Sequence, residues 1–240
     1  MIEIPAGAFR MGSDAGPEDE RPAHEVFLPA YAIDRLPVTN AAFAAFLNAA
    51  GPKNARGERL YDDDDSDARI HLANEFKPGR WRADPGYEAH PAVEVSFRGA
   101  AEYCAWSGKR LPTEAEWEKA ARGADGRRYP WGNQAPDATR ARYGAAFNAT
   151  VPAGSHPAGA SAYGVRDMAG NVWQWTSSLY RPYPWRADDG REDARSPETR
   201  VTRGGAHDWP ADALAATHRG RGLSRAPAAG HHNIGFRCAR

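Results

Sequence analysis

The chain has 240 residues and carries 31 basic and 31 acidic side chains, so it has no net charge at neutral pH when its histidines are neutral. This balance gives no electrostatic reason to expect nucleic acid or an anionic membrane as a partner. No run of about 18 apolar residues is present, and the first residues lack the basic and apolar regions of a secretory signal, so we expect a cytoplasmic protein. The 24 Gly, 19 Pro and eight Trp indicate a globular protein rich in turns and loops, long enough to bury its own core.

The N-terminal region predicts short strands. Residues 2–12 predict a strand, a Pro-Ala-Gly turn and a second strand, and residues 25–32 return to a strand pattern. The polar, acidic residues 13–24 between them predict a mobile loop.

Three helices are predicted in the N-terminal half, each beginning after a capping hydroxyl and ending at a glycine. They run from Thr39 to Gly51, from Ser96 to Gly108 and from Thr113 to Gly123. The third helix has the strongest start signal, because Thr113 and Glu116 have the spacing of a capping box.

Two polar segments predict surface insertions, residues 52–89 and 181–200. The first contains four consecutive aspartates, Asp62 to Asp65, which could hold a cation, but such a run is more typical of a solvated loop. Residues 127–240 alternate short apolar pieces with turn residues, and no repeat or change of composition divides the chain. We therefore predict one α+β domain.

Residues 167–176 predict a core strand that is entered through a turn. Trp173 and Trp175 are two positions apart, so they share one face of an extended segment. Asp167 and Gln174, with the carbonyls between them, could form an oxygen cage for Ca²⁺. A turn stabilised by an Asx-type hydrogen bond explains the same residues.

Cysteine is rare in this sequence. Cys104 and Cys238 are too few for a disulfide framework or a zinc cage, and residue pattern alone favours two buried, inert thiols.

Seven segments, taken together and in order, resemble the formylglycine-generating enzyme or sulfatase-modifying factor family. They are residues 4–13 (IPAGAFRMGS), 37–40 (PVTN), 108–118 (GKRLPTEAEWE), 129–132 (YPWG), 167–175 (DMAGNVWQW), 203–205 (RGG) and 235–238 (GFRC). The resemblance covers residues 1–240 as a single domain. It implies the formylglycine-generating-enzyme-like variant of the C-type lectin fold, with little regular secondary structure.

The family oxidises a substrate cysteine to formylglycine with copper and oxygen, using two cysteines between the RGG and GFR motifs. Residues 206–234 contain no cysteine. Because soft thiolates hold Cu(I), we expect neither copper nor this oxidase activity. Cys104 and Cys238 match the family's structural pair, and a disulfide between them would contribute about 4–5 kcal/mol.

The resemblance also implies one Ca²⁺ site, made of the Asp167 and Gln174 side chains and the Gly170 and Val172 carbonyls. Gln174 stands where the family usually has Glu, and the lost charge should weaken binding. A second family Ca²⁺ site, expected between residues 142 and 156, has no carboxylate here, so we predict that it is absent.

The C-terminal segment contains five candidate ligands for iron or zinc: His207, Asp208, His218, His231 and His232. Related sulfoxide synthases use iron, with ligands largely from a helical domain that is not in these 240 residues. His231 and His232 are adjacent and would point opposite ways in an extended segment. Surface or hydrogen-bonded histidines are therefore the favoured interpretation.

Three arginines follow His218 closely in the sequence. Arg219, Arg221 and Arg225 could form a basic rim for a carboxylate or phosphate, but structural salt bridges are the favoured reading.

Two functional hypotheses follow. The first is a monomeric, non-catalytic module that binds a protein or small molecule through residues 206–233, including Trp209. In one form of it this segment is diversified by a retroelement, since residues 206–232 contain no Lys, Glu, Gln or Met; a GC-rich genome gives the same bias. The second is a metal-dependent oxidoreductase that uses His and Asp ligands. An accessory domain for another enzyme is a third, weaker option.

Overall fold

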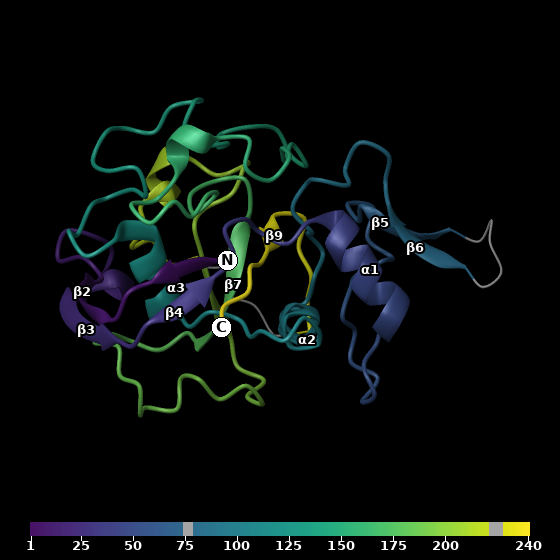
Figure 1. The fold of residues 1–240 in the computed structure, drawn as a ribbon, viewed down its shortest axis with the longest axis horizontal. Coiled ribbons are helices and arrows are strands. Elements are labelled where there is room, and N and C mark those ends of the chain that lie inside the picture. Colours follow the sequence, from purple (N-terminus) through teal and green to yellow (C-terminus); the bar gives the residue numbers. More distant parts are fainter. Residues whose placement is uncertain (74–78, 221–227) are drawn as a thin grey trace.

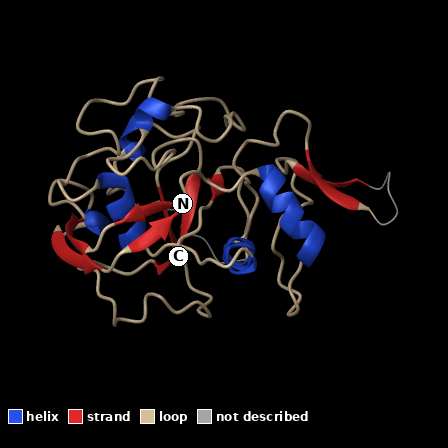
Figure 2. Ribbon diagram, viewed as in Figure 1, coloured by secondary structure: helices blue, strands red, loops and turns tan. Residues whose placement is uncertain are grey.

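The computed structural model describes residues 1–73, 79–220 and 228–240. Short strands and helices alternate with long loops (Figures 1 and 2). In chain order the elements are β1 (Ile2–Ile4), β2 (Gly7–Met11), η1 (Glu18–Glu20), β3 (His24–Leu28), β4 (Tyr31–Ile33), α1 (Asn40–Ala50), β5 (Ile70–Ala73), β6 (Arg80–Ala83), α2 (Phe97–Trp106), α3 (Glu114–Arg122), η2 (Pro157–Gly159), β7 (Trp173–Leu179), β8 (Arg200–Arg203), η3 (Ala211–Leu214) and β9 (Ile234–Gly235). The fold is α+β, as the sequence predicts.

Strand β7 is the centre of a three-stranded sheet, with β8 antiparallel on one side and β9 parallel on the other. Trp173 and Trp175 of this strand are fully buried in one hydrophobic core. The Trp175 indole N–H donates to the Val95 carbonyl over 3.0 Å, so this polar group has a hydrogen-bond partner inside the core. The predicted core strand is therefore present.

The α-helices of the described residues are the three that the sequence predicts. The side chains of Thr39, Ser96 and Thr113 each accept a backbone N–H of the first helical turn. In α3 the Glu116 carboxylate also accepts the Thr113 N–H over 2.8 Å, which completes the capping box. These caps satisfy N–H groups that have no partner within the helix.

Residues 52–89 contribute to the core as well as to the surface. Strands β5 and β6 form a hairpin that lies beside α1 (Figure 1). Asn48 of α1 and the Trp81 backbone exchange two hydrogen bonds of 2.8 and 2.9 Å. Leu60 and Tyr61 are completely buried. The sequence does not indicate this, because the apolar residues of the segment stand singly among charged neighbours.

The two chain ends lie close together (Figure 1). Arg240 and Ala32 exchange backbone hydrogen bonds of 2.7 and 2.8 Å, and a disulfide joins Cys104 of α2 to Cys238. The tail is thereby attached to β4 and to α2. Among the described residues, no helix is both long and apolar enough to cross a membrane.

A buried network of charges connects α3 to β8 and to the C-terminal segment. Glu118 pairs with Arg203 and, over 3.1 Å, with Arg122. Glu114 accepts the Arg219 Nε–H over 2.8 Å and lies 3.5 Å from Arg203. Both carboxylates, Arg203 and Arg219 have side chains that are 0% exposed. Removing one partner would leave its counterpart as an uncompensated buried charge.

We expect Glu118→Gln to lower the free energy of unfolding by about 3–5 kcal/mol, the usual cost of breaking a buried ion pair from one side. Urea denaturation measures the loss. Glu3→Gln, at an exposed position of β1, is the control and should change stability little. A loss no larger than that of the control would contradict the importance of the network.

Candidate functional site

The predicted C-terminal site residues fall into two groups that meet at Trp173. The Trp209 ring contacts Trp173 edge-on, with 5.2 Å between ring centroids. The His218 ring lies 5.8 Å from Trp173. Trp209 adjoins the group of His207 and Asp208, whereas His218 belongs to a separate pocket.

His207 is fully buried in the first group, with its two ring nitrogens in different environments. Nδ1 lies 2.8 Å from the Asn171 carbonyl, so this nitrogen carries the proton and donates it. Nε2 is buried and makes no hydrogen bond with any residue that the structure describes. Burial lowers the pKa of His207 below its ordinary value, which favours the neutral ring and leaves the Nε2 lone pair unused.

Asp208 organises the rest of this group. It accepts hydrogen bonds from His232 Nε2 over 2.9 Å and from the Asn233 amide over 3.2 and 3.3 Å. Burial alone would raise the pKa of Asp208, but these hydrogen bonds hold it below its ordinary value. The His232 ring also packs on Phe147, with 4.1 Å between centroids.

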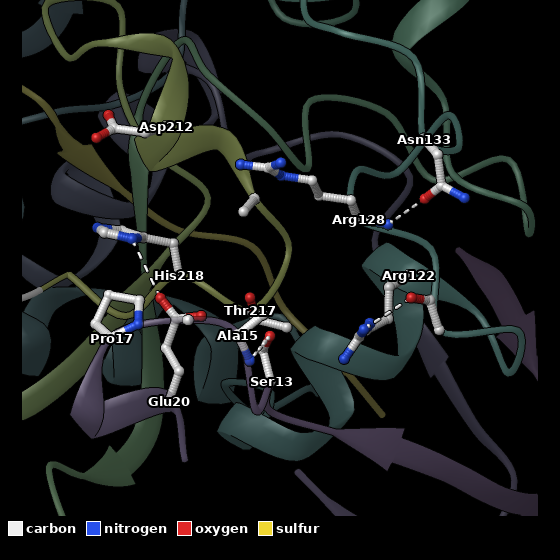
Figure 3. A pocket seen from close by; sticks show the side chains of 13 residues that line it. Ser13, Ala15, Pro17, Glu20, Arg122, Arg128, Asn133, Asp212, Thr217 and His218 are labelled. Carbon is white, nitrogen blue, oxygen red and sulfur yellow. Dashed lines mark hydrogen bonds and ion pairs between the residues drawn. The ribbon is translucent and has the colours of Figure 1, made fainter. Parts of the chain in front are cut away.

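His218 lines the pocket drawn in Figure 3, a cavity of about 420 Å³ that we call the His218 pocket. One wall is formed by the loop that leads into η1 and by η1 itself. The others are the end of α3, the turn after α3, and the η3 segment. The lining residues are Ser13, Ala15, Gly16, Pro17, Glu20, Arg122, Gly126, Arg128, Asn133, Asp212, Ala215, Thr217 and His218.

The charged groups of the pocket come from distant parts of the chain. His218 Nδ1 lies 3.3 Å from Glu20 Oε1, and Glu20 is only 2% exposed. Burial would raise the pKa of Glu20, but hydrogen bonds from His218 and Thr217 lower it, so the carboxylate is charged at neutral pH. Figure 3 shows the Arg128 guanidinium directed toward the Asp212 and His218 side of the cavity. Among the described residues this guanidinium has no hydrogen-bond partner.

A histidine metal centre is the less favoured alternative from the sequence, and the described part of the chain does not bring three of these candidate ligands together. His218 lies beside Glu20 rather than His207. The side-chain donors of His207, Asp208, His218, His231 and His232 do not bring three ligand atoms within 4.8 Å of one another. In the residues that the structure describes, the set that does so is Asp65, Asp67 and Glu94.

Arg219 is a core residue and not part of an exposed rim. It is 1% exposed, pairs with Glu114, and its guanidinium lies 4.2 Å from the Tyr180 ring and 4.6 Å from the Tyr183 ring. The structural salt bridge that the sequence favoured is therefore its role. Arg221 and Arg225 lie outside the described residues.

Hydrogen bonds occupy the residues expected to bind calcium near β7. The Gln174 amide oxygen accepts from Trp117 Nε1 over 2.9 Å and from Arg237 Nε over 2.7 Å. Asp167 Oδ2 accepts the Gly154 N–H over 2.7 Å, and burial raises the pKa of this carboxyl. A cation here would have to displace the Arg237 contact to reach Gln174. Calcium bound by Asp167, Gly170, Val172 and Gln174 stays a prediction.

Sequence reasoning missed several pocket residues. The sequence predicts a mobile loop around Glu20, and Arg128 and Asp212 belong to no motif. A local signal was present only in the acidic character of residues 18–20, which predicts a charged surface but not a partner nearly 200 positions away.

Comparison with known proteins identifies the family. The sequence profile of the sulfatase-modifying factor enzyme 1-like domain matches residues 1–240. The chain is 36% identical to formylglycine-generating enzyme of Thermomonospora curvata, over 100% of this chain and 92% of that protein. It is 34% identical to inactive C-alpha-formylglycine-generating enzyme 2 of Mus musculus, over 100% of this chain and 85% of the relative. The chain therefore belongs to the formylglycine-generating enzyme family.

The chain is also similar to two further proteins. Hercynine oxygenase of Mycolicibacterium smegmatis is 40% identical over 76% of this chain, which spans 46% of that protein's length. The solved structure of PvdO from Pseudomonas aeruginosa matches with a TM-score of 0.73 and 27% identity, covering 99% of this chain and 92% of the other. The fold is thus the formylglycine-generating-enzyme-like variant of the C-type lectin fold.

We expect the folded protein to lose stability as the pH falls below about 6.5, the ordinary histidine pKa, through His207. The pKa of His207 is lowered in the folded state, so the unfolded chain binds the proton first and acid favours unfolding. Urea denaturation at pH 7.5 and 5.5 measures this, and His207→Gln should remove part of the difference. An NMR titration in which the His207 ring protonates at its ordinary pKa would contradict the prediction.

Proposed function

We propose that this chain is a recognition module without formylglycine oxidase chemistry, which binds a small polar ligand or a polar side chain of a protein partner. The observation that carries the proposal is the His218 pocket. Its C-terminal wall belongs to the segment expected to display a ligand-binding surface. Its volume of about 420 Å³ falls within the range of about 300–1,000 Å³ typical of ligand sites.

The thiol chemistry of the family does not fit the residues present. Both cysteines of the chain are used in the buried disulfide between Cys104 and Cys238. No cysteine remains in the segment between Arg203 and Ile234 to hold Cu(I), and oxygen and nitrogen donors are a poor substitute for that soft ion. The inactive mouse relative is compatible with a member of the family that acts without this chemistry.

The charges of the pocket favour a ligand that carries both signs. The Arg128 guanidinium can form a paired hydrogen bond with a carboxylate or phosphate. The Glu20 carboxylate and Asp212 can accept hydrogen bonds from an ammonium group or an amide on the other side. A zwitterion the size of an amino acid meets both requirements.

A panel of the twenty common amino acids and their N-acetyl and amide derivatives tests this by calorimetric titration. We expect at least one member with a free carboxylate to bind, and Arg128→Gln to weaken it by about tenfold or more, as for loss of a charge-assisted hydrogen bond. Arg127→Gln is the matched control, because Arg127 pairs with Asp125 outside the pocket. Unchanged affinity in Arg128→Gln, or no binding by any member, would contradict the proposal.

A metal-dependent oxidoreductase is the second candidate, favoured by the free Nε2 of His207 and by the hercynine oxygenase relative. Fixing Nδ1 on a backbone carbonyl is how proteins orient a metal-binding histidine. Elemental analysis of the protein, purified without any chelator, separates the two candidate functions. About one Fe, Cu or Zn per chain, lost in His207→Ala, would support the enzyme; a recognition module predicts none.

The retroelement form of the recognition module makes a prediction about DNA rather than protein. A second copy of the sequence encoding residues 206–232, differing only at adenines, should lie near the gene. Sequencing the flanking DNA checks this, and the absence of such a copy would remove that form of the proposal.

A further inference from the structure

Three carboxylates from two distant loops meet at one place beside α2. Oxygen atoms of Asp65, Asp67 and Glu94 all lie within 4.8 Å of one another. Asp65 and Asp67 belong to the loop before β5, and Glu94 precedes the first turn of α2. None of these residues belongs to the His218 pocket or to the Asp167 and Gln174 pair, so the cluster is independent of the function proposed above.

Glu94 is the member that a solvated acidic loop does not explain. It is 2% exposed, and its carboxylate has no hydrogen-bond donor and no cation as partner among the described residues. Burying an unpaired carboxylate is costly, so such groups normally have a compensating partner. Here burial, followed by the charges of Asp65, Asp62 and Asp67, raises the pKa of Glu94 to about 8.

The backbone holds Glu94 firmly in this position. Its N–H donates to the His231 carbonyl over 3.0 Å, and its carbonyl accepts the Asp62 N–H over 2.9 Å. Its φ of 55° is in the left-handed region, which costs a non-glycine residue on the order of 1 kcal/mol or more. Gly230 covers the side chain so closely that a Cβ there would lie 2.9 Å from Glu94 Oε2. The surrounding chain therefore fixes a buried acid next to two others.

Arg59, a cationic side chain in the same part of the chain, is paired with other aspartates. Arg59 pairs with Asp62 at 2.5 Å and with Asp64 at 2.8 Å. The Asn148 amide donates to Asp67, and the Asp67 N–H donates to Asp65 over 2.8 Å. Among the described residues these bonds bring no positive charge to Asp65, Asp67 or Glu94, so no cationic side chain compensates the cluster.

We propose that Asp65, Asp67 and Glu94 bind one Ca²⁺ ion. Three carboxylates with no sulfur or nitrogen donor suit a hard cation that takes oxygen ligands. The ion would offset the free-energy cost of burying Glu94, and it would attach the loop before β5 to the start of α2. Because Glu94 also bonds to the His231 backbone, the ion would stabilise the side of the C-terminal segment that follows the undescribed residues.

Calorimetric titration of Ca²⁺ into the chelator-treated full chain tests this. We expect about one ion per chain, and a loss of affinity of at least about tenfold in Glu94→Gln, because one of three ligand charges is removed with little change of shape. Asp65→Asn should act in the same direction and lies at an exposed position, so it keeps the test open if Glu94→Gln does not fold. Asp63→Asn removes the same charge from the same loop but none of the three ligands, and should bind normally.

Asp167→Asn separates this site from the one predicted near β7. An ion retained in Asp167→Asn but lost in Glu94→Gln and Asp65→Asn would support the proposal. An ion lost only in Asp167→Asn, equal affinity in Glu94→Gln and the parent chain, or no binding up to millimolar Ca²⁺ would overturn it. Tighter binding of Mg²⁺ than of Ca²⁺ would overturn the assignment of the ion.

Discussion

The candidate site depends on a buried set of ion pairs. In it the α3 glutamates, Glu114 and Glu118, pair with Arg203 of β8 and with Arg219. Arg203 donates to the carbonyls of Ala216 and Thr217 over 2.9 and 2.8 Å, directly before His218. On the other side, Glu118 accepts the Gly12 N–H over 2.8 Å, at the start of the loop that leads to Glu20. Two of the walls of the His218 pocket are therefore attached to one cluster of charges inside the protein.

Burying charged side chains costs free energy, and the ion pairs and hydrogen bonds within the network offset that cost. The Arg203 guanidinium contacts two carboxylates and two carbonyls, and the Arg219 guanidinium packs against the Tyr180 and Tyr183 rings. Among the described residues the Arg203 Nε is left without a hydrogen-bond partner, but both terminal nitrogens of this guanidinium are bonded. Buried polar networks in which most members are paired favour one arrangement of the chain over its alternatives. This explains how a protein with short strands and long loops can hold a polar pocket in a defined shape.

Local structure could be predicted from the sequence, whereas residue patterns alone did not predict long-range contacts. The Cys104–Cys238 disulfide followed only from the family resemblance, because residue pattern alone favoured two free thiols. The three helices have caps and apolar spacings that act within four residues, so Thr39, Ser96 and Thr113 indicate them directly. Trp173 and Trp175 likewise predict the core strand, because residues two positions apart share one face of an extended segment. In contrast, Glu20 meets His218 and Glu94 meets Asp65 only because of the tertiary fold, and nothing in their neighbouring residues indicates those partners. The family resemblance predicted the fold, but it directed attention to histidines that the structure separates into two groups.

The backbone and the side chains of the C-terminal segment have different roles. The carbonyls of residues 216 and 217 are held by Arg203, whatever side chains those positions carry. The side chains of Asp212 and His218 line the cavity, with Asp212 at an exposed position and His218 beside Glu20 and Trp173. Substitutions at the pocket-facing positions can therefore change what is bound while the anchoring bonds persist. The same scaffold is in this sense evolvable: ligand preference can drift between descendants of this chain without a matching loss of folding stability.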